Sequence, residues 1–262
     1  EGTPTDYQRC ELLRDVLMND FSFTVVDQIY DPGASSSEVT AALNEGRSFV
    51  NYIGHGSGTY WGTTGFGVST ISNLSNGWMN PFVIDVACLN GDFTMGTCME
   101  EAWLRAGSEA DPKGAIAVYG STTNASWVPP CVMQSHAVEL ITTYEKMTVG
   151  GVCFNGLMYA MDQYGGSTGE GLKMMEQFHI FGDCSTYLVF TTTPDNIPPT
   201  TITDLRVDDI ASDSYKLMWT TPYDETSNGV VSYDVRSSNS PITSDAQFLA
   251  GTQVPSGVPK TT

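Results

Sequence analysis

Positively charged side chains are scarce in this chain. Its 262 residues include 11 Lys and Arg against 30 Asp and Glu, which gives a formal net charge of −19 at pH 7. Because binding to nucleic-acid phosphates depends on Lys and Arg, this balance argues against nucleic acid as a partner. An acidic surface is typical of soluble extracellular or salt-exposed proteins, and it can also attract basic peptides to a cleft.

Long apolar runs are absent as well. No stretch of about 18 apolar residues occurs, so the sequence predicts no membrane span. The chain has neither an initiator Met nor a signal peptide, and we expect Glu1 to begin a fragment or a processed product. Hydrophobic residues still make up 40% of the chain, which is enough for a packed core.

Paired cysteine motifs are also missing. None of the cysteines has the CxxC spacing, so a zinc site is not expected. The cysteines are Cys10, Cys88, Cys98, Cys131, Cys153 and Cys184. They could pair in fifteen ways, and the sequence does not choose among these pairings. If Cys88 is a free nucleophile, at least one of the others is also unpaired.

Two short apolar runs each lead into a reactive side chain. Residues 49–53 precede His55, and residues 81–87 precede Cys88. Such runs predict buried strands of a parallel sheet, whose carboxyl ends face the crevice where open α/β sheets keep their active sites. The 33 positions between the two residues (88 − 55) are about the length of one βαβ unit. A thiol and an imidazole brought together can act as a nucleophile and its base.

Each of these residues alone has a plainer interpretation. A lone Cys88 is more often a small buried hydrophobic residue, and His55 could be a polar residue satisfied within a tight turn. The glycines on both sides of His55 favour catalysis, because they let backbone and substrate approach closely. The N–H of Gly56 could also bind an oxyanion. Taken together, the two strand-end residues predict nucleophilic catalysis.

The rest of the first 190 residues alternates between helical and strand patterns. Periodicity and capping predict helices over 7–19, 37–43 with Ser37 as the cap, 68–74, 98–105, 132–144 and 152–163. Apolar runs predict further strands over 21–29 and 115–119, and at least one within 178–190. This alternation is typical of an α/β fold with a mostly parallel sheet.

The residues around the two strand ends resemble a known family. Gly54-His55-Gly56 and the segment 85–93 (DVACLNGDF) are similar to those of the gingipain-like cysteine peptidases, peptidase family C25 of the caspase-like clan. Further matches follow in the family's order at 30–33, 60–63, 101–106, 120–127, 150–152 and 181–183. The resemblance covers about residues 1–191. It implies a caspase-like fold, in which His and Cys follow two adjacent parallel strands of a sheet flanked by helices.

The resemblance also implies roles for single residues. Cys88 would be the nucleophile and His55 the general base, and the backbone N–H groups of Gly56 and Cys88 would hold the oxyanion. Trp127 matches an aromatic residue that lines the family's substrate pocket, although its type alone is equally consistent with a half-buried surface Trp. Cys131 stands where relatives have Met, which implies a smaller wall on that side of the pocket.

Two acidic residues of the family lie upstream of the region that matches Glu1. One orients the catalytic His, and the other selects Arg in the substrate pocket. We therefore expect this chain to lack both, because they lie on a separate chain of the same precursor or because the chain is truncated. Specificity for Arg or Lys stays open. Asp92, close to the nucleophile, is interpreted as a residue that stabilises the turn.

Other ionisable residues carry weaker predictions. His136 is expected on the surface of a helix, and His179 as a satisfied residue of the sheet. Asp208, Asp209 and Asp213 form an acidic cluster that could bind Ca²⁺, but its spacing does not match an EF-hand, and a solvated turn is the commoner interpretation. The resemblance implies that structural Ca²⁺ is possible, without identifying its ligands, and that catalysis requires no cofactor.

A change in composition marks a second region. Residues 192–199 are rich in Pro and Thr and predict a linker between a catalytic domain at 1–191 and a smaller domain at 200–262. Short alternating runs predict an all-β fold there, at 202–207, 214–219 and 230–236. This domain resembles a fibronectin type III or immunoglobulin-like module, with Trp219 and Tyr233 as core aromatics. About 60 residues are too few for a complete sandwich.

These observations predict a secreted or cell-surface cysteine endopeptidase of a bacterium or archaeon. It would hydrolyse peptide bonds of protein or peptide substrates through a Cys88–His55 dyad and a thioester acyl-enzyme. Two alternatives stay open: a sortase-like transpeptidase, which attaches proteins to the bacterial surface, and a catalytically silent surface adhesin. The intact Gly54-His55-Gly56 and Cys88 argue against the adhesin.

Overall fold

The computed structural model describes residues 2–21, 23–166, 168–190, 200–208, 216–220, 222 and 234–254. The chain divides into two units, Glu1–Phe190 and Thr191–Thr262. The first unit carries both strand-end residues, His55 and Cys88, and is built from alternating helices and strands.

A four-stranded sheet forms the centre of the first unit. Its strands are β1 (Phe49–Ile53), β2 (Phe82–Val86), β3 (Ala117–Ser121) and β4 (Phe178–Gly182), in that spatial order. β1, β2 and β3 run parallel, and β4 pairs antiparallel with β3 at the edge. The predicted α/β class with a mostly parallel sheet is therefore confirmed. The closing strand predicted within 178–190 is β4.

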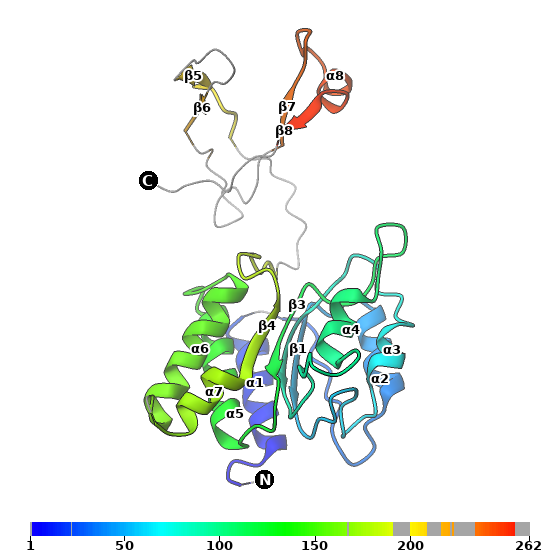
Figure 1. The fold of residues 1–262 in the computed structure, drawn as a ribbon, viewed down its shortest axis with the longest axis vertical. Helices are drawn as coiled ribbons and strands as arrows, with labels where there is room; N and C mark the ends of the chain where they lie inside the picture. Colours follow the sequence, from blue (N-terminus) through cyan, green and yellow to red (C-terminus); the bar gives the residue numbers. More distant parts are fainter. Residues whose placement is uncertain are drawn as a thin grey trace. The chain divides into compact units, whose positions relative to one another are not determined.

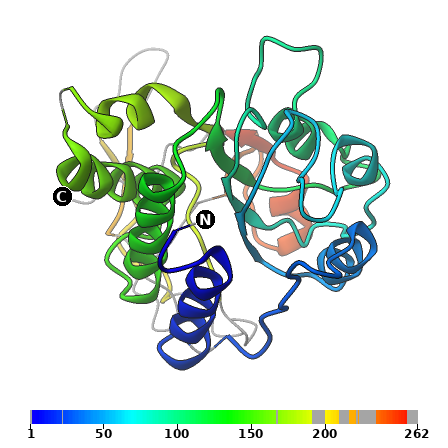
Figure 2. The same cartoon turned by 90° about the horizontal axis from the view of Figure 1, so that it is seen from below.

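Helices cover both faces of this sheet (Figures 1 and 2). On one face lie α1 (Asp6–Asn19), α5 (Val128–Thr142), α6 (Val149–Tyr164) and α7 (Glu170–Gln177). On the other face lie α2 (Ser36–Asn44), α3 (Val68–Ile71) and α4 (Met99–Arg105). Within the described residues, no helix combines the length and apolar character needed to cross a membrane.

The structure corrects two details of the predicted helices. Ser35, not Ser37, caps α2, because the Ser35 hydroxyl accepts a hydrogen bond from the backbone N–H of Glu38. α7 was not predicted at all. It begins after Gly169. The Gly- and Ser-rich stretch 165–169 before it contains no pattern that predicts the start of a helix.

The strand predicted over 21–29 is wrong, since the described residues of this segment form no strand. Phe21 and Phe23 explain the misleading pattern. Both rings pack against Phe190, with ring centroids 6.0 Å and 5.7 Å away. The apolar residues thus anchor an extended connection to the core, and they do not alternate between the two faces of a sheet.

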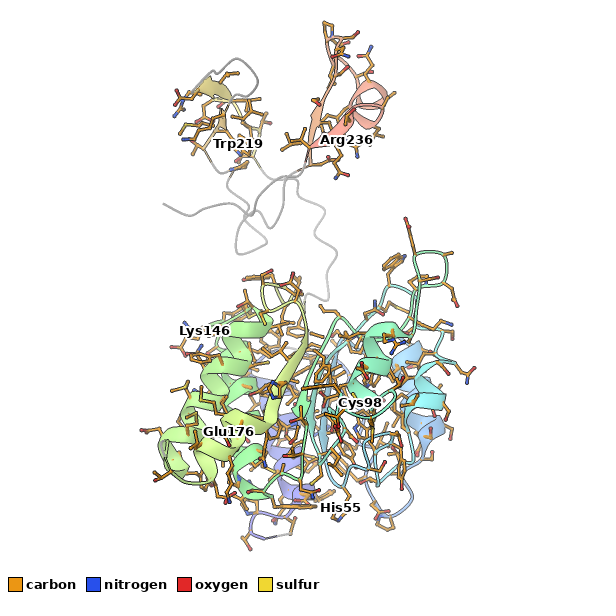
Figure 3. The ribbon with its side chains drawn as sticks, in the orientation of Figure 1. His55, Cys98, Lys146, Glu176, Trp219 and Arg236 are labelled. Carbon is orange, nitrogen blue, oxygen red and sulfur yellow. The ribbon has the colours of Figure 1, made fainter. Side chains whose placement is uncertain are left out.

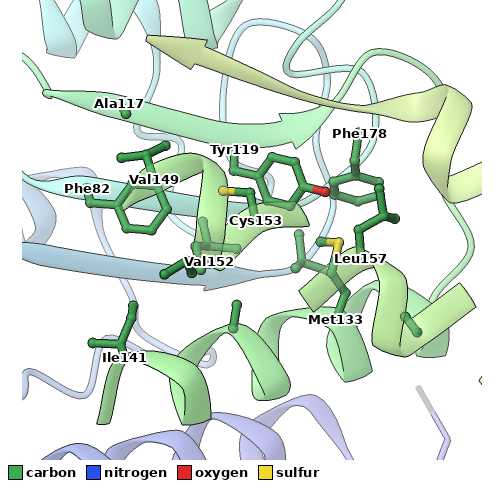
Figure 4. Packing of buried hydrophobic residues seen from close by; sticks show 14 of the residues in the cluster. Phe82, Ala117, Tyr119, Met133, Ile141, Val149, Val152, Cys153, Leu157 and Phe178 are labelled. Carbon is green, nitrogen blue, oxygen red and sulfur yellow. The ribbon is translucent and has the colours of Figure 1, made fainter. Parts of the chain in front are cut away.

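β2 is buried on both faces, which explains its nearly continuous apolar sequence. Phe82 and Ile84 belong to the core that faces α5 and α6, where Phe82 lies among aliphatic side chains of these helices (Figure 4). Val83 and Ala87 belong to the core on the side of α2, α3 and α4. Because side chains alternate along a strand, Asp85 points to that second face. It is a buried carboxylate within a strand whose other residues are apolar.

The second unit contains two small antiparallel sheets. β5 (Arg206–Asp208) pairs with β6 (Lys216–Met218), and β7 (Val235–Ser237) pairs with β8 (Thr252–Val254). A short helix, α8 (Asp245–Leu249), precedes β8. Each of the three runs predicted to be β overlaps one of these strands. The predicted linker at 192–199 and Tyr233 lie outside the described residues, and the likeness to a fibronectin type III or immunoglobulin module stays a prediction.

Candidate active site

Pairing of β1 with β2 brings the two reactive side chains to one edge of the sheet. The strands pair with an offset of 33 positions, as in Ile53 opposite Val86 (86 − 53). His55 and Cys88 have the same offset (88 − 55), so each lies two residues beyond this last pair. A hydrogen bond of 3.2 Å from Gly54 N to Val86 O continues the ladder toward them. Since neighbouring strands lie about 4.8 Å apart, this register places the two residues on adjacent segments of the chain at that edge.

Gly56 lets the loop that follows β1 approach the loop that follows β2. A β carbon at this position would collide with the carbonyl oxygen of Cys88 and would lie 2.9 Å from the β carbon of Ala87. Only glycine fits so close an approach. Among the described residues, no hydrogen bond uses the backbone N–H of Gly56 or of Cys88. Their predicted role as oxyanion donors stays a prediction.

A strained turn follows Cys88 directly. Leu89 has φ of +67°, in the left-handed region that non-glycine residues rarely adopt. Two hydrogen bonds hold it there, from Leu89 N to Thr123 O at 3.0 Å and from Asp92 N to Leu89 O at 2.8 Å. Asp92 also accepts hydrogen bonds from the backbone and hydroxyl of Thr94, which confirms its predicted role in the turn.

The Cys88 thiol lies at a cleft that is open to solvent. The cleft is lined by Ile53, Gly54, Val86, Ala87, Cys88, Ala125, Ser126 and Trp127. The sulfur accepts a hydrogen bond from Ala125 N at 3.4 Å and lies 3.8 Å from Ala125 O. The loop after β3 thus forms the wall opposite the ends of β1 and β2.

Trp127 joins this wall to the histidine. Its ring packs edge-on against the His55 ring, with centroids 5.0 Å apart, at the edge of the unit where Figure 3 shows His55. Its indole N–H donates a hydrogen bond of 2.7 Å to Oδ1 of Asp6 in the first turn of α1. Asp6 is not among the residues predicted for the site from the sequence, because the acidic residue of the pocket was expected upstream of Glu1. No local pattern could have shown this contact, which joins residues 121 positions apart.

A buried polar cluster lies behind the two strand ends. Asp85 Oδ2 accepts hydrogen bonds from Trp61 Nε1 and Asn90 Nδ2, both at 2.8 Å. Burial raises the pKa of Asp85 from 3.8 to about 6, against the opposing effect of these two bonds. Glu100 of α4 is fully buried as well, and burial, together with the charge of Asp85, raises its pKa well above the usual value. The sequence signal for this cluster was one carboxylate within the apolar run 81–87.

The other candidate residues are not among those that line this cleft. Cys131 is 1% exposed and donates a hydrogen bond of 3.2 Å from its thiol to the carbonyl oxygen of Trp127, so its role as a pocket wall stays a prediction. His136 contacts Glu139 and stacks on Tyr159, as expected of a helix-surface residue. His179 is exposed on β4, with a ring nitrogen 3.2 Å from the carbonyl oxygen of Glu176.

Metal-binding groups do not gather in the part of the chain that the structure describes: no three His, Cys, Asp or Glu residues there could share an ion. Two members of the predicted acidic cluster, Asp209 and Asp213, lie outside the described residues. A calcium site therefore stays a prediction.

Sequence comparisons connect this chain with known peptidases. Residues 10–189 match the model of peptidase family C25. Gingipain R1 of Porphyromonas gingivalis is 36% identical over 198 residues, which make up 74% of this chain and 20% of that protein. Gingipain R2 of the same bacterium is 38% identical over 183 residues, or 68% of this chain and 24% of that protein. The chain thus spans only a minor part of the length of these curated relatives.

Solved structures give the same result. The crystal structure of the Arg-specific cysteine proteinase gingipain R matches with a TM-score of 0.67 and 35% identity, over 70% of this chain and 43% of that one. The complex of Porphyromonas gingivalis RgpB pro- and mature domains matches with a TM-score of 0.65 and 36% identity, over 74% of this chain and 48% of that one. Both support the α/β fold of the first unit.

Differences in burial among the thiols predict selective alkylation. Brief treatment with iodoacetamide at about pH 7 should label half-buried Cys88 and exposed Cys184 first. The other thiols should stay protonated, because burial raises the pKa of Cys10 to about 12, of Cys98 and Cys131 to about 11, and of Cys153 well above its usual value. Peptide mass spectrometry measures the labelling. Equal labelling of Cys153 and Cys88 would contradict the structure.

Proposed function

Because the chain belongs to peptidase family C25, we propose that it is a cysteine endopeptidase with Cys88 as nucleophile and His55 as general base. The observation that carries this proposal is the offset of 33 positions shared by the strand pairing and by these two residues. It supports an imidazole next to a thiol, which is the arrangement that activates a cysteine nucleophile. The position of Cys88 in the lining of an open cleft supports access of a peptide to the sulfur.

The proposed reaction passes through a thioester. His55 takes the proton of the Cys88 thiol, and the resulting thiolate attacks the carbonyl carbon of the scissile bond. The N–H groups of Gly56 and Cys88 stabilise the oxyanion of the tetrahedral intermediate. His55 then gives its proton to the leaving amine as the C–N bond breaks. Finally, His55 activates a water molecule, which hydrolyses the thioester and releases the free thiol.

We propose further that the cleft prefers an Arg side chain before the cleaved bond. The indole of Trp127 lines the cleft, and the carboxylate of Asp6 lies 2.7 Å from its nitrogen. An aromatic face beside a carboxylate suits a guanidinium, which can stack on the ring and pair with the acid. The Arg specificity named for the solved gingipain R supports the same preference.

The relatives also suggest partners and a location. The RgpB complex of pro- and mature domains supports a segment of the same precursor as a partner. We propose protein or peptide substrates, and secretion or surface display by a bacterium. The second unit would act as a fibronectin type III or immunoglobulin-like spacer. Structural Ca²⁺ is compatible with this proposal, and the dyad itself requires no cofactor.

Substitution of the dyad tests the proposed chemistry. Cys88→Ala and His55→Ala should each lower kcat/KM for a fluorogenic peptide by roughly 10³-fold or more, because each removes a group that acts on the reacting atoms. His136→Ala is the matched control, since this histidine contacts Glu139 on the surface of α5. Full activity of Cys88→Ala would refute the assignment. Transfer of the acyl group to an added amine, without hydrolysis, would indicate a transpeptidase instead.

Asp6→Asn tests the specificity. Asparagine keeps an oxygen that can accept the hydrogen bond of Trp127 but removes the charge, so kcat/KM for peptides with Arg before the cleaved bond should fall about 10–100-fold. Peptides with Ala at that position should be cleaved at an unchanged rate. Asp15→Asn, at an exposed position of the same helix, is the control. An equal loss of kcat/KM for Arg and Ala peptides would show that Asp6 does not interact with the charge of the substrate's Arg side chain.

A further inference from the structure

Asp85 contacts both loops that carry the dyad. Its Oδ2 atom accepts a hydrogen bond from Trp61, in the loop after β1, and another from Asn90, in the loop after β2. Trp61 is paired through a β-bridge with Gly56, one residue after the histidine. Asn90 lies two residues beyond Cys88, and its Oδ1 atom accepts a hydrogen bond of 3.1 Å from Gly58 N. One buried carboxylate is therefore the common anchor of the two loops.

Glu100 occupies the space beside Asp85. Gly120 is the register partner of Asp85 on β3, and a β carbon on Gly120 would overlap the Glu100 carboxyl group. A β carbon on Gly91 would lie 2.6 Å from the same group. Within the described residues, both carboxyl oxygens of Glu100 and Oδ1 of Asp85 are buried and have no hydrogen-bond partner. Two glycines thus leave room for a second acid next to the first.

We propose that Asp85 is a positioning residue that holds the His55 loop against the Cys88 loop, and that Glu100 stays neutral so that Asp85 carries the single charge of the pair. This inference rests on the proposed function, because positioning matters only for a working dyad. Two buried carboxyl groups this close do not both ionise. The charge on Asp85 strengthens its hydrogen bonds to Trp61 and Asn90.

The surroundings of Asp85 determine how pH acts on it. Glu100 faces it from α4 and Tyr52 from β1, where burial raises the pKa of the tyrosine. Trp61 and Asn90 are neutral donors, and in the described part of the chain no Lys, Arg or His contacts the pair. Because the pKa of Asp85 in the folded state, about 6, lies above its ordinary 3.8, the folded state binds this proton more tightly. The contribution of Asp85 to stability therefore falls as the pH rises from about 3.8 to about 6, and it stays constant at higher pH.

Two substitutions of Asp85 test the positioning. Asp85→Ala removes both hydrogen bonds, and kcat for peptide hydrolysis should fall about 10–100-fold with KM nearly unchanged. Asp85→Asn keeps an oxygen that can accept both bonds and should recover most of this loss. The rate of Cys88 alkylation, relative to that of Cys184 in the same molecule, should fall with kcat in Asp85→Ala. Asp15→Asn, an exposed carboxylate of α1, should change neither quantity.

The alkylation ratio separates this proposal from the proposed function. If the wild type cleaves no peptide, the proposed function fails. The ratio of the Cys88 to the Cys184 alkylation rate still measures whether Asp85 positions the Cys88 thiol. An unchanged ratio in Asp85→Ala would overturn the positioning role. A second result would also overturn it: Asp85→Ala melts at a lower temperature, but its kcat, divided by the amount of Cys88 that can be alkylated, equals that of the wild type. This result would show that Asp85 acts on stability alone.

The pH dependence of stability tests whether Asp85 is ionised in the folded protein. It also tests the proposal if Asp85→Ala does not fold. The melting temperature of the wild type minus that of Asp85→Asn should fall between about pH 4 and pH 6 and then stay constant. Ionisable groups that do not interact with Asp85 contribute equally to both proteins and cancel in this difference. A difference that does not vary with pH would show that Asp85 does not carry the charge, and would overturn the proposal.

Discussion

The parallel pairing of β1 with β2 is the constraint on which the site depends. This pairing is held by side chains buried on both faces of β2, among them Phe82 and Ile84 on one face and Val83 on the other. A slip by one residue would exchange the two faces and bury the wrong side chains in each core. The same slip would move Cys88 out of line with His55. The packing that stabilises the sheet therefore also sets the geometry of the proposed dyad.

Close approach of the two loops has a cost in stability. Gly56 gives up a side chain, Leu89 adopts a left-handed conformation, and Asp85 ionises where burial opposes its charge. Each of these features is unfavourable by itself. These features lie within a few residues of the reactive side chains. The aliphatic core between β2, α5 and α6 contains none of them. Such a concentration of unfavourable local features is typical of a functional site.

The sequence predicts what depends on local pattern. The strands before His55 and Cys88 and most helices follow from short apolar runs, periodicity and caps, and the shared spacing of 33 positions is visible in the sequence. Contacts between distant segments are not visible. Asp6 reaches Trp127 across 121 positions, so its place beside the cleft could not be predicted from the residues around it. The segment 21–29 shows the opposite failure. Its apolar residues have the pattern of a strand, but Phe21 and Phe23 pack against Phe190 and hold an extended connection to the core.

The proposed reaction requires that His55 lie close enough to Cys88 to take its proton. The rate constant for alkylation of Cys88 at about pH 7, compared between the wild type and His55→Ala, measures this most directly. Without the imidazole the thiol loses its base, so the account predicts that the rate will fall by about tenfold or more, while Cys184 reacts as before. Equal rates for Cys88 in the two proteins would contradict the account.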